Sequence, residues 1–374
     1  MTINTNKILK SVFFSSVFLC VSCNDVLDEV PDNRTEIDSA EKIGELLTGA
    51  YPEGAYIPFL EPRTDNAEDK GRAGGDERIN RESFFWNDVF DPDNDYPLNY
   101  WNSAYSAIAQ ANQALVSIEE LRSSGMEDNL DKYEGEALLA RSYAHFMLLN
   151  IWAKPYDSAT AESDLGIPYV EEPETVLIKE YERASVAEVY RNIVADLERG
   201  FLLIEDDYEK ESFHFTKEAA AAFASRVYLH LGQWDKVEQF SNFVLSSDNI
   251  SNQLRDWVYY RSLTYSQISA LYSSSDEPAN LLVVSAGSLY ARNFFSARYQ
   301  LAPGLSNELF SNGNPTGGAW AYPLYGTDLA YNIPKFSEYF RVTNASANIG
   351  NAYVQYVLLS TDEVLLNLAE AKVM

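Results

Sequence analysis

The chain has 374 residues, of which 46% are apolar, and a formal net charge of −28 from 56 acidic and 28 basic side chains. This apolar content is enough for a sizeable core and excludes wholesale disorder. The negative charge repels phosphate backbones and anionic lipids, so we expect no nucleic acid partner. Aromatic residues make up 13% of the chain, which favours stacking surfaces in addition to a core.

Residues 1–22 are predicted to be a signal peptide, because Lys7 and Lys10 open an apolar run too short to span a bilayer comfortably. The run ends in LCVSC, from Leu19 to Cys23, which has the pattern of a bacterial lipobox. We therefore expect cleavage before Cys23 and lipid attachment to Cys23. The alternative is an ordinary signal peptide with incidental cysteines. The chain has no cysteine besides Cys20 and Cys23, so neither a zinc site nor a C-x-x-C redox site is expected.

An acidic, proline-marked tether is expected over residues 23–38, followed by a helical domain over residues 39–374. Helical spacing of apolar residues predicts helices over residues 39–51, 100–121, 131–152, 185–204, 216–231, 233–247 and 360–373. The polar residues suited to cap them are Ser39, Ser185, Thr216 and either Ser360 or Thr361. The predicted fold class is therefore mostly α.

The predicted helices form antiparallel pairs with small residues where they would cross, which indicates an irregular tetratricopeptide-like repeat scaffold. The clearest pair spans residues 221–244. In it Ser225, Tyr228, Gly232 and Trp234 stand where such a repeat carries a small residue, a tyrosine, a glycine and an aromatic residue. We expect Gly232 to make the turn between the two helices.

Two regions, residues 52–97 and about 250–355, lack helical periodicity and are rich in proline, glycine or aromatic residues. They are too long for passive connectors and predict folded functional loops. Residues 281–287 are the best strand candidate.

One hypothesis is that the aromatic residues in these loops form a binding surface for sugars, because sugar rings present flat C–H faces that pack on aromatic rings. Neighbouring Asp, Asn and Arg side chains would bind the hydroxyl groups. The alternative is that these rings fill the core beneath the loops. The candidate glycan-binding residues are Asp65, Trp86, Tyr290, Trp320 and Tyr322.

We find none of the sequence motifs G-x-S-x-G, H-E-x-x-H, the Walker loop or the dinucleotide fingerprint, so no catalytic residue and no cofactor is expected. His145, His214 and His230 are interpreted as packed or solvated helix residues. The chain has many acids, which leaves a glycosidase with two carboxylates as an alternative.

The segment DPDND places Asp91, Asp93 and Asp95 at the alternate spacing of a calcium loop. An EF-hand would need glycine and glutamate where Tyr96 and Asn102 stand. A solvated acidic turn is therefore favoured, and no metal site is predicted, although calcium binding stays open.

An ordered set of short motifs runs from residue 23 to the end of the chain. The set comprises Cys23 to Pro31, LTGAY at 47–51, Trp101 with Tyr105, Ile108 and Asn112, GEA at 135–137 with Arg141, Tyr143 and Phe146, GIP at 166–168, Asp196 with Leu197, Thr216 with Lys217 and Ala219 to Ala222, and Glu370 with Ala371. In this order they resemble the SusD-like (RagB/SusD) surface lipoproteins of Bacteroidetes.

This resemblance implies a tetratricopeptide-like scaffold whose loops bind an oligo- or polysaccharide without catalysis. It also implies docking as a lid on a SusC-like TonB-dependent transporter, with the lipid anchor in the outer membrane at the cell surface. A helical scaffold for a protein or peptide partner is the main alternative. Family members continue beyond the helix that contains Glu370, so we expect a fragment or a truncated gene that leaves Leu365, Leu366 and Leu368 exposed.

Overall fold

The computed structural model describes residues 37–71, 74–126, 129–176, 179–245, 250–294, 296–310, 335–347 and 349–374. Contacts within the chain divide it into two units, Met1–Asp38 and Ser39–Met374, and the second contains all of the helices and strands of the described residues. The predicted signal peptide and Cys23 lie outside the described residues. In the part of the chain that is described, no helix is both long enough and apolar enough to cross a membrane.

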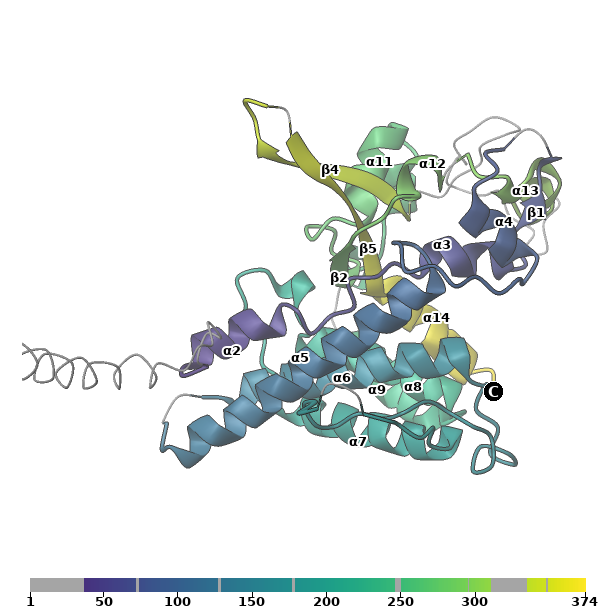
Figure 1. The fold of residues 1–374 in the computed structure, drawn as a ribbon. Helices are drawn as coiled ribbons and strands as arrows, with labels where there is room; N and C mark the ends of the chain where they lie inside the picture. The colour runs from purple at the N-terminus through teal and green to yellow at the C-terminus, as the bar shows by residue number, and fades with distance from the viewer. Residues whose placement is uncertain are drawn as a thin grey trace, which may run out of the picture. The chain divides into compact units, whose positions relative to one another are not determined.

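Every helix predicted from the sequence is present, and the structure is mostly helical (Figure 1). Four of these helices begin at the predicted caps, because Ser39, Ser185, Thr216 and Ser360 each accept a hydrogen bond from a backbone N–H of the first turn. The long helices are α2 (Ala40–Leu47), α5 (Pro97–Ser123), α6 (Asp131–Trp152), α7 (Val186–Leu203), α8 (Lys217–His230), α9 (Trp234–Val244) and α14 (Thr361–Ala371).

The helices pack in sequence as antiparallel neighbours, α5 on α6, α6 on α7, and α8 on α9, with α14 against both α8 and α9. Helix α6 is the centre of this array, and it is buried on nearly every side from Glu134 to Leu149. Gly232 makes the turn between α8 and α9 with a φ of 65°, a left-handed conformation that glycine adopts at little cost. The predicted repeat-like pairing of α8 and α9 is therefore confirmed.

A buried ion pair joins the central helices. The guanidinium of Arg141 on α6 donates to both carboxylate oxygens of Asp196 on α7, at 2.7 and 2.8 Å. Its Nη1 also donates to Oδ1 of Asn112 on α5 at 2.9 Å, and the hydroxyl of Tyr169 donates to Asp196 at 2.6 Å. Three helices and the segment around residue 170 are thus fixed by one charged network.

His145 belongs to the same region and is packed, as the sequence predicts. Its Nε2 accepts the backbone N–H of Val170 at 3.0 Å, and burial lowers the pKa of His145 to about 3, so it stays neutral. The interpretation of His214 as a helix residue is wrong. It follows a short 3-10 turn, and its Nδ1 lies 2.7 Å from a carboxylate oxygen of the buried Glu136.

The two regions without helical periodicity contain short helices and two small sheets, β1-β3 and β2-β5-β4. The predicted strand at residues 281–287 is confirmed as β2, which pairs antiparallel with β5, and β5 pairs antiparallel with β4. The sequence interpretation missed β4 and β5. The elements of these regions are α3 (Ile57–Leu60), η2 (Glu61–Arg63), β1 (Glu68–Asp69), α4 (Arg78–Phe84), η5 (Ile250–Asn252), α10 (Trp257–Tyr260), α11 (Tyr265–Tyr272), β2 (Asn280–Ala286), α12 (Ala291–Phe294), β3 (Tyr299–Gln300), α13 (Pro303–Phe310), β4 (Ser337–Asn344) and β5 (Ile349–Ser360). A further 3-10 turn, η4 (Glu211–Phe213), lies between α7 and α8.

The two loop regions are joined to each other. Strand β1 pairs with β3, and the side chain of the buried Asn80 both donates to and accepts from the backbone of Tyr299 at 2.9 Å. Arg298 binds Asp69 with two hydrogen bonds of 2.6 and 2.7 Å. Contacts between residues more than 200 positions apart in the sequence therefore hold the first loop region against the second.

The buried ion pair predicts a large stability difference between two arginine substitutions. Arg141→Ala leaves the carboxylate of Asp196 buried without its charged partner, and we expect a loss of about 3–5 kcal/mol in the free energy of unfolding. Arg191→Ala removes an ion pair with Glu162 whose two side chains are mostly exposed, and should cost about 0–1 kcal/mol. Urea unfolding followed by far-UV circular dichroism measures both. Equal losses would contradict the assignment.

Candidate functional site

A groove of about 500 Å³ opens where α3, the loop after α4, the start of α5 and the end of α6 meet. Its base contains two indole rings, Trp101 and Trp152, which meet edge to face at 5.0 Å and are partly exposed. Phe90 stands at its rim with 87% of its surface exposed. The lining residues are Phe59, Arg63, Asn87, Asp88, Val89, Phe90, Pro97, Leu98, Trp101, Ile151 and Trp152.

Trp86 stands immediately before the rim residues Asn87 and Asp88, and it is 68% exposed. The guanidinium carbon of Arg63, a lining residue, lies 4.9 Å from the centre of the Trp86 ring, in a cation–π contact. Nε of Arg63 donates to the carbonyl of Ser83 at 3.3 Å. Burial lowers the pKa of Arg63, and the nearby Asp88 offsets part of that effect. The groove thus combines aromatic rings with a half-buried cation and an acid.

The backbone of Trp86 adopts a left-handed conformation, with a φ of 58°. This is the residue after the C-cap of α4, and the helix end has the hydrogen bonds of a Schellman motif: Trp86 N–H to Ser83 at 3.1 Å and Asn87 N–H to Glu82 at 2.9 Å. Glycine is the usual residue in this place, and a side chain here costs about 1–2 kcal/mol. A large exposed ring at a strained position points to a functional rather than a structural role.

The structure brings only part of the predicted set near this groove. Trp86 adjoins it, and Asp65 is exposed two positions after the lining residue Arg63. Tyr290 is 4% exposed and packs edge to face on Phe294 at 5.9 Å, so its ring face is not available to a ligand and it leaves the candidate set. Trp320 and Tyr322 lie outside the described residues.

Sequence reasoning did not select Trp101, Trp152 or Phe90 as site residues. Trp101 falls inside the predicted helix 100–121, and the helical pattern gives no reason to separate it from the core. Trp101 lies in the first turns of α5 and Trp152 is the last residue of α6, and both rings stay half-buried. The signal that could have found them is the presence of two tryptophans within a few residues of a predicted helix boundary.

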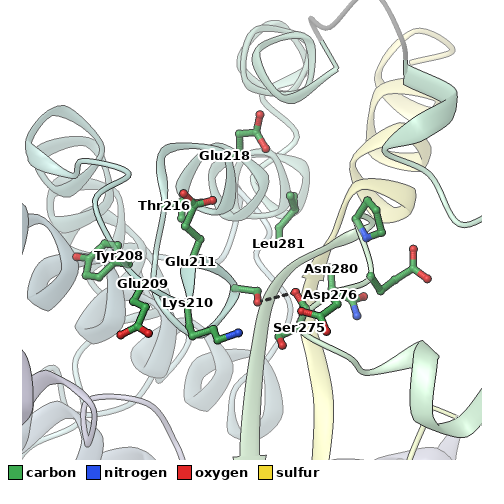
Figure 2. A pocket seen from close by; sticks show the side chains of 13 residues that line it. Tyr208, Glu209, Lys210, Glu211, Thr216, Glu218, Ser275, Asp276, Asn280 and Leu281 are labelled. Atoms are coloured by element: carbon green, nitrogen blue, oxygen red, sulfur yellow. Dashed lines mark hydrogen bonds between the residues drawn. The ribbon is translucent and has the colours of Figure 1, made fainter.

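A second pocket, of about 370 Å³, lies between the segment 208–218 and the segment 275–281 (Figure 2). The Ser212 hydroxyl donates to the carbonyl of Ser275 at 3.1 Å across it. Its lining is mainly polar and acidic, and burial together with Asp206 and Glu211 raises the pKa of Glu218. Tyr208 is the sole aromatic residue among those that line it. The aromatic groove is therefore better suited than this pocket to a ligand that binds by stacking.

The acidic segment DPDND is not a simple solvated turn. Asp95 is 1% exposed, and one of its carboxylate oxygens accepts the backbone N–H groups of Leu289 and Tyr290 at 2.7 and 2.9 Å. Asp91 forms an ion pair with Arg78 at 3.1 Å. Within the described ranges, no group of three or more His, Cys, Asp or Glu side chains is placed to hold a metal ion. The solvated-turn interpretation is wrong for Asp95, whose carboxylate links the two loop regions.

Fold and groove together describe a helical-repeat protein with a loop-borne binding groove, and comparison with known proteins identifies the class. Residues 25–229, more than half of the chain, match the SusD-like family model described as "Starch-binding associating with outer membrane". The chain therefore belongs to the SusD-like family. This is a family of binding proteins rather than enzymes, in agreement with the prediction from the sequence.

Individual relatives are distant in sequence. The SusD-like protein P2 of Formosa agariphila is 23% identical, in an alignment that covers 98% of this chain and 77% of that protein. A SusD superfamily protein from Bacteroides thetaiotaomicron has a TM-score of 0.63 at 20% identity, covering 90% of this chain and 76% of that one. A SusD-like carbohydrate binding protein from Bacteroides vulgatus has a TM-score of 0.62 at 18% identity, and the match covers 89% of this chain and 71% of that one. A laminarin binding SusD-like protein has a TM-score of 0.57 at 17% identity, and the match covers 89% of this chain and 79% of that one. These structures confirm the predicted fold.

The strain at Trp86 predicts an unusual order of stability for two variants. Trp86→Gly and Trp86→Ala both remove the ring, and they differ in whether the left-handed backbone at this position is strained. We expect the glycine variant to be more stable than the alanine variant by about 1 kcal/mol. At an ordinary helical position the order is reversed. Urea unfolding of the two variants measures the difference, and equal stability would show that the position is unstrained.

Proposed function

We propose that this chain is a cell-surface lipoprotein of the outer membrane that binds a glycan and delivers it to a SusC-like TonB-dependent transporter as the transporter's lid. The observation that carries the proposal is the aromatic groove with the exposed Trp86 beside it. Family membership supports it, because the family is described as starch-binding and associated with the outer membrane. Two structural neighbours are named for carbohydrate and laminarin binding.

The chemistry of the groove suits a chain of neutral sugars. An indole ring offers a flat apolar face to the C–H face of a sugar ring. Arg63 and Asn87 supply hydrogen-bond donors, and Asp88 and Asn87 supply acceptors, which matches the mixed donors and acceptors of neighbouring hydroxyl groups. The volume of about 500 Å³ lies within the range of small-molecule sites. Asp65 is proposed at the edge of this site, and Trp320 and Tyr322 as contacts from the second loop region.

The composition of the groove favours binding over hydrolysis. Glycosidases use two carboxyl groups about 5–10 Å apart on either side of the scissile bond. Among the residues that line the groove in the structure, Asp88 is the one acid. A bound glycan would therefore leave the site chemically unchanged, as capture for a transporter requires.

The groove predicts which variant loses glycan binding. Trp86→Ala removes the stacking face, and we expect at least about tenfold weaker binding, equivalent to roughly 1.4 kcal/mol. Affinity gel electrophoresis against a panel of neutral polysaccharides identifies the ligand, and calorimetry then measures the affinity. Tyr259→Ala is the matched control, because Tyr259 is a 54% exposed ring on α10 that does not line the groove. If the unaltered protein is retarded by no glycan, the protein-scaffold alternative gains support.

The lipid anchor is tested with the two cysteines. Cys23→Ala removes the thiol that takes the lipid, so the protein should no longer incorporate labelled palmitate or sediment with the outer membrane. Cys20→Ala should change neither property, because Cys20 belongs to the segment removed on export. Both variants are expressed in a Bacteroidetes host and fractionated. Continued labelling of Cys23→Ala would contradict the assignment.

A further inference from the structure

One arginine of the aromatic groove has most of its hydrogen-bond donors unused. Nε of Arg63 donates to the carbonyl of Ser83 at 3.3 Å, and neither Nη group has an acceptor among the described residues. Asp88 is close enough to act on the charge of Arg63, but it forms no ion pair with it in the part of the chain that the structure describes. Because Arg63 lines the groove, these donors are available to a ligand there.

The charge of Arg63 is half-buried without a carboxylate to compensate it. Removing a cation from water is costly unless it is paired, and burial accordingly lowers the pKa of Arg63. Two buried arginines of the helical scaffold behave differently. Burial opposes their charge as well, but the pKa of Arg141 and of Arg226 is raised, because each pairs with a carboxylate, that of Asp196 or Glu363. Arg63 lacks the kind of partner that these two arginines have.

The donors that stay open suit one kind of anion. The N–H groups of a guanidinium lie in its plane and form a fork that matches the two oxygens of a carboxylate. The contact with the Trp86 ring, at 4.9 Å from the guanidinium carbon, uses the positive charge but none of these donors. Trp86 therefore helps to hold Arg63 in place while the fork remains free for a carboxylate.

The charges around the groove permit an anion, although the chain as a whole has a net charge of −28. Among the residues that line the groove in the structure, Arg63 is the one cation and Asp88 is the one acid. The second pocket is lined by one lysine and five acids: Lys210, Glu209, Glu211, Glu218, Asp276 and Glu277. At physiological ionic strength, exposed charges more than about 8 Å away are largely screened, so the groups in each cavity decide. The groove can therefore accept an anion that the second pocket repels.

We propose that Arg63 binds the carboxylate of an acidic sugar unit, so that the ligand of the groove is a glycan that carries uronic acids among its neutral sugars. This inference rests on the proposed function and names the class of glycan. The indole rings bind the neutral units, and Arg63 adds the selection for the acidic unit. Because the contact with Trp86 restrains the guanidinium before the ligand arrives, less order has to be gained on binding.

Paired polysaccharides test the class of ligand. Polygalacturonate, alginate, hyaluronate and glucuronoxylan are each compared with the same polymer after its carboxyl groups have been reduced to primary alcohols, which keeps the backbone and removes the charge. We expect at least one acidic polymer to retard the purified protein in affinity gel electrophoresis. Its reduced form should bind at least about tenfold more weakly, because hydrogen bonds between two charged groups are stronger than those to a hydroxyl. Carrageenan, which carries sulfate esters and no carboxylate, separates the two kinds of anion.

Substitutions of Arg63 then locate the selection. Arg63→Gln removes the charge, and calorimetry should show about tenfold to hundredfold weaker binding of the acidic polymer and no preference over its reduced form. Arg63→Lys keeps the charge without the planar fork, so it should recover part of the preference. Arg261→Gln is the matched control, because Arg261 is an exposed arginine that does not line the groove, and it should bind as the unaltered protein does. Circular dichroism checks that each variant keeps its fold.

The results distinguish a failure of this inference from a failure of the proposed function. Retardation by neutral polysaccharides alone, or equal binding of an acidic polymer and its reduced form, would overturn the role of Arg63 and leave a glycan-binding protein. Retardation by carrageenan and by no polymer with carboxylates would also overturn it. So would an Arg63→Gln variant that keeps the same preference as Arg261→Gln. Retardation by no polysaccharide, acidic or neutral, would contradict the proposed function itself.

Discussion

The buried ion pair of Arg141 and Asp196 is the interaction on which the arrangement of the central helices depends. It joins α6 to α7 directly, and through Asn112 and Tyr169 it includes α5 and the segment that follows α6. A buried charge pair is costly to desolvate, so it is tolerated only in the geometry that satisfies every donor and acceptor. The pair therefore allows a single register of the three helices. The ends of α5 and α6 are placed by that register.

The groove follows from this placement. Trp101 near the start of α5 and Trp152 at the end of α6 meet because the two helices are held side by side. The loops then complete the site, and they are ordered by contacts with each other rather than by their own sequences. Asn80 and Asp95 each fix a backbone segment of the second region at hydrogen-bond distance. A helical scaffold whose loops are joined to each other by hydrogen bonds is well suited to hold aromatic rings in a fixed position for a ligand.

At Trp86 the residue that the backbone conformation favours differs from the residue that the chain carries. Helix α4 ends in a motif that favours glycine, and the chain has a large exposed ring there instead. Such a conflict is expected where a side chain is retained for what it binds.

The sequence alone determined the helices, because their apolar spacing and their serine and threonine caps are local features. It also determined the family, because the ordered motifs lie along one chain. It named Trp86 from its loop context, but it could not separate Trp86 from Tyr290, since exposure depends on what packs against a ring. Strand β5 was missed because its apolar residues do not alternate with polar ones along the sequence, and β4 because more than half of its residues are polar and none is buried. Only the tertiary structure decided that the two loop regions are joined and that Trp101 and Trp152 lie together in one groove. Each of these depends on contacts between residues far apart in the chain, which no local pattern records.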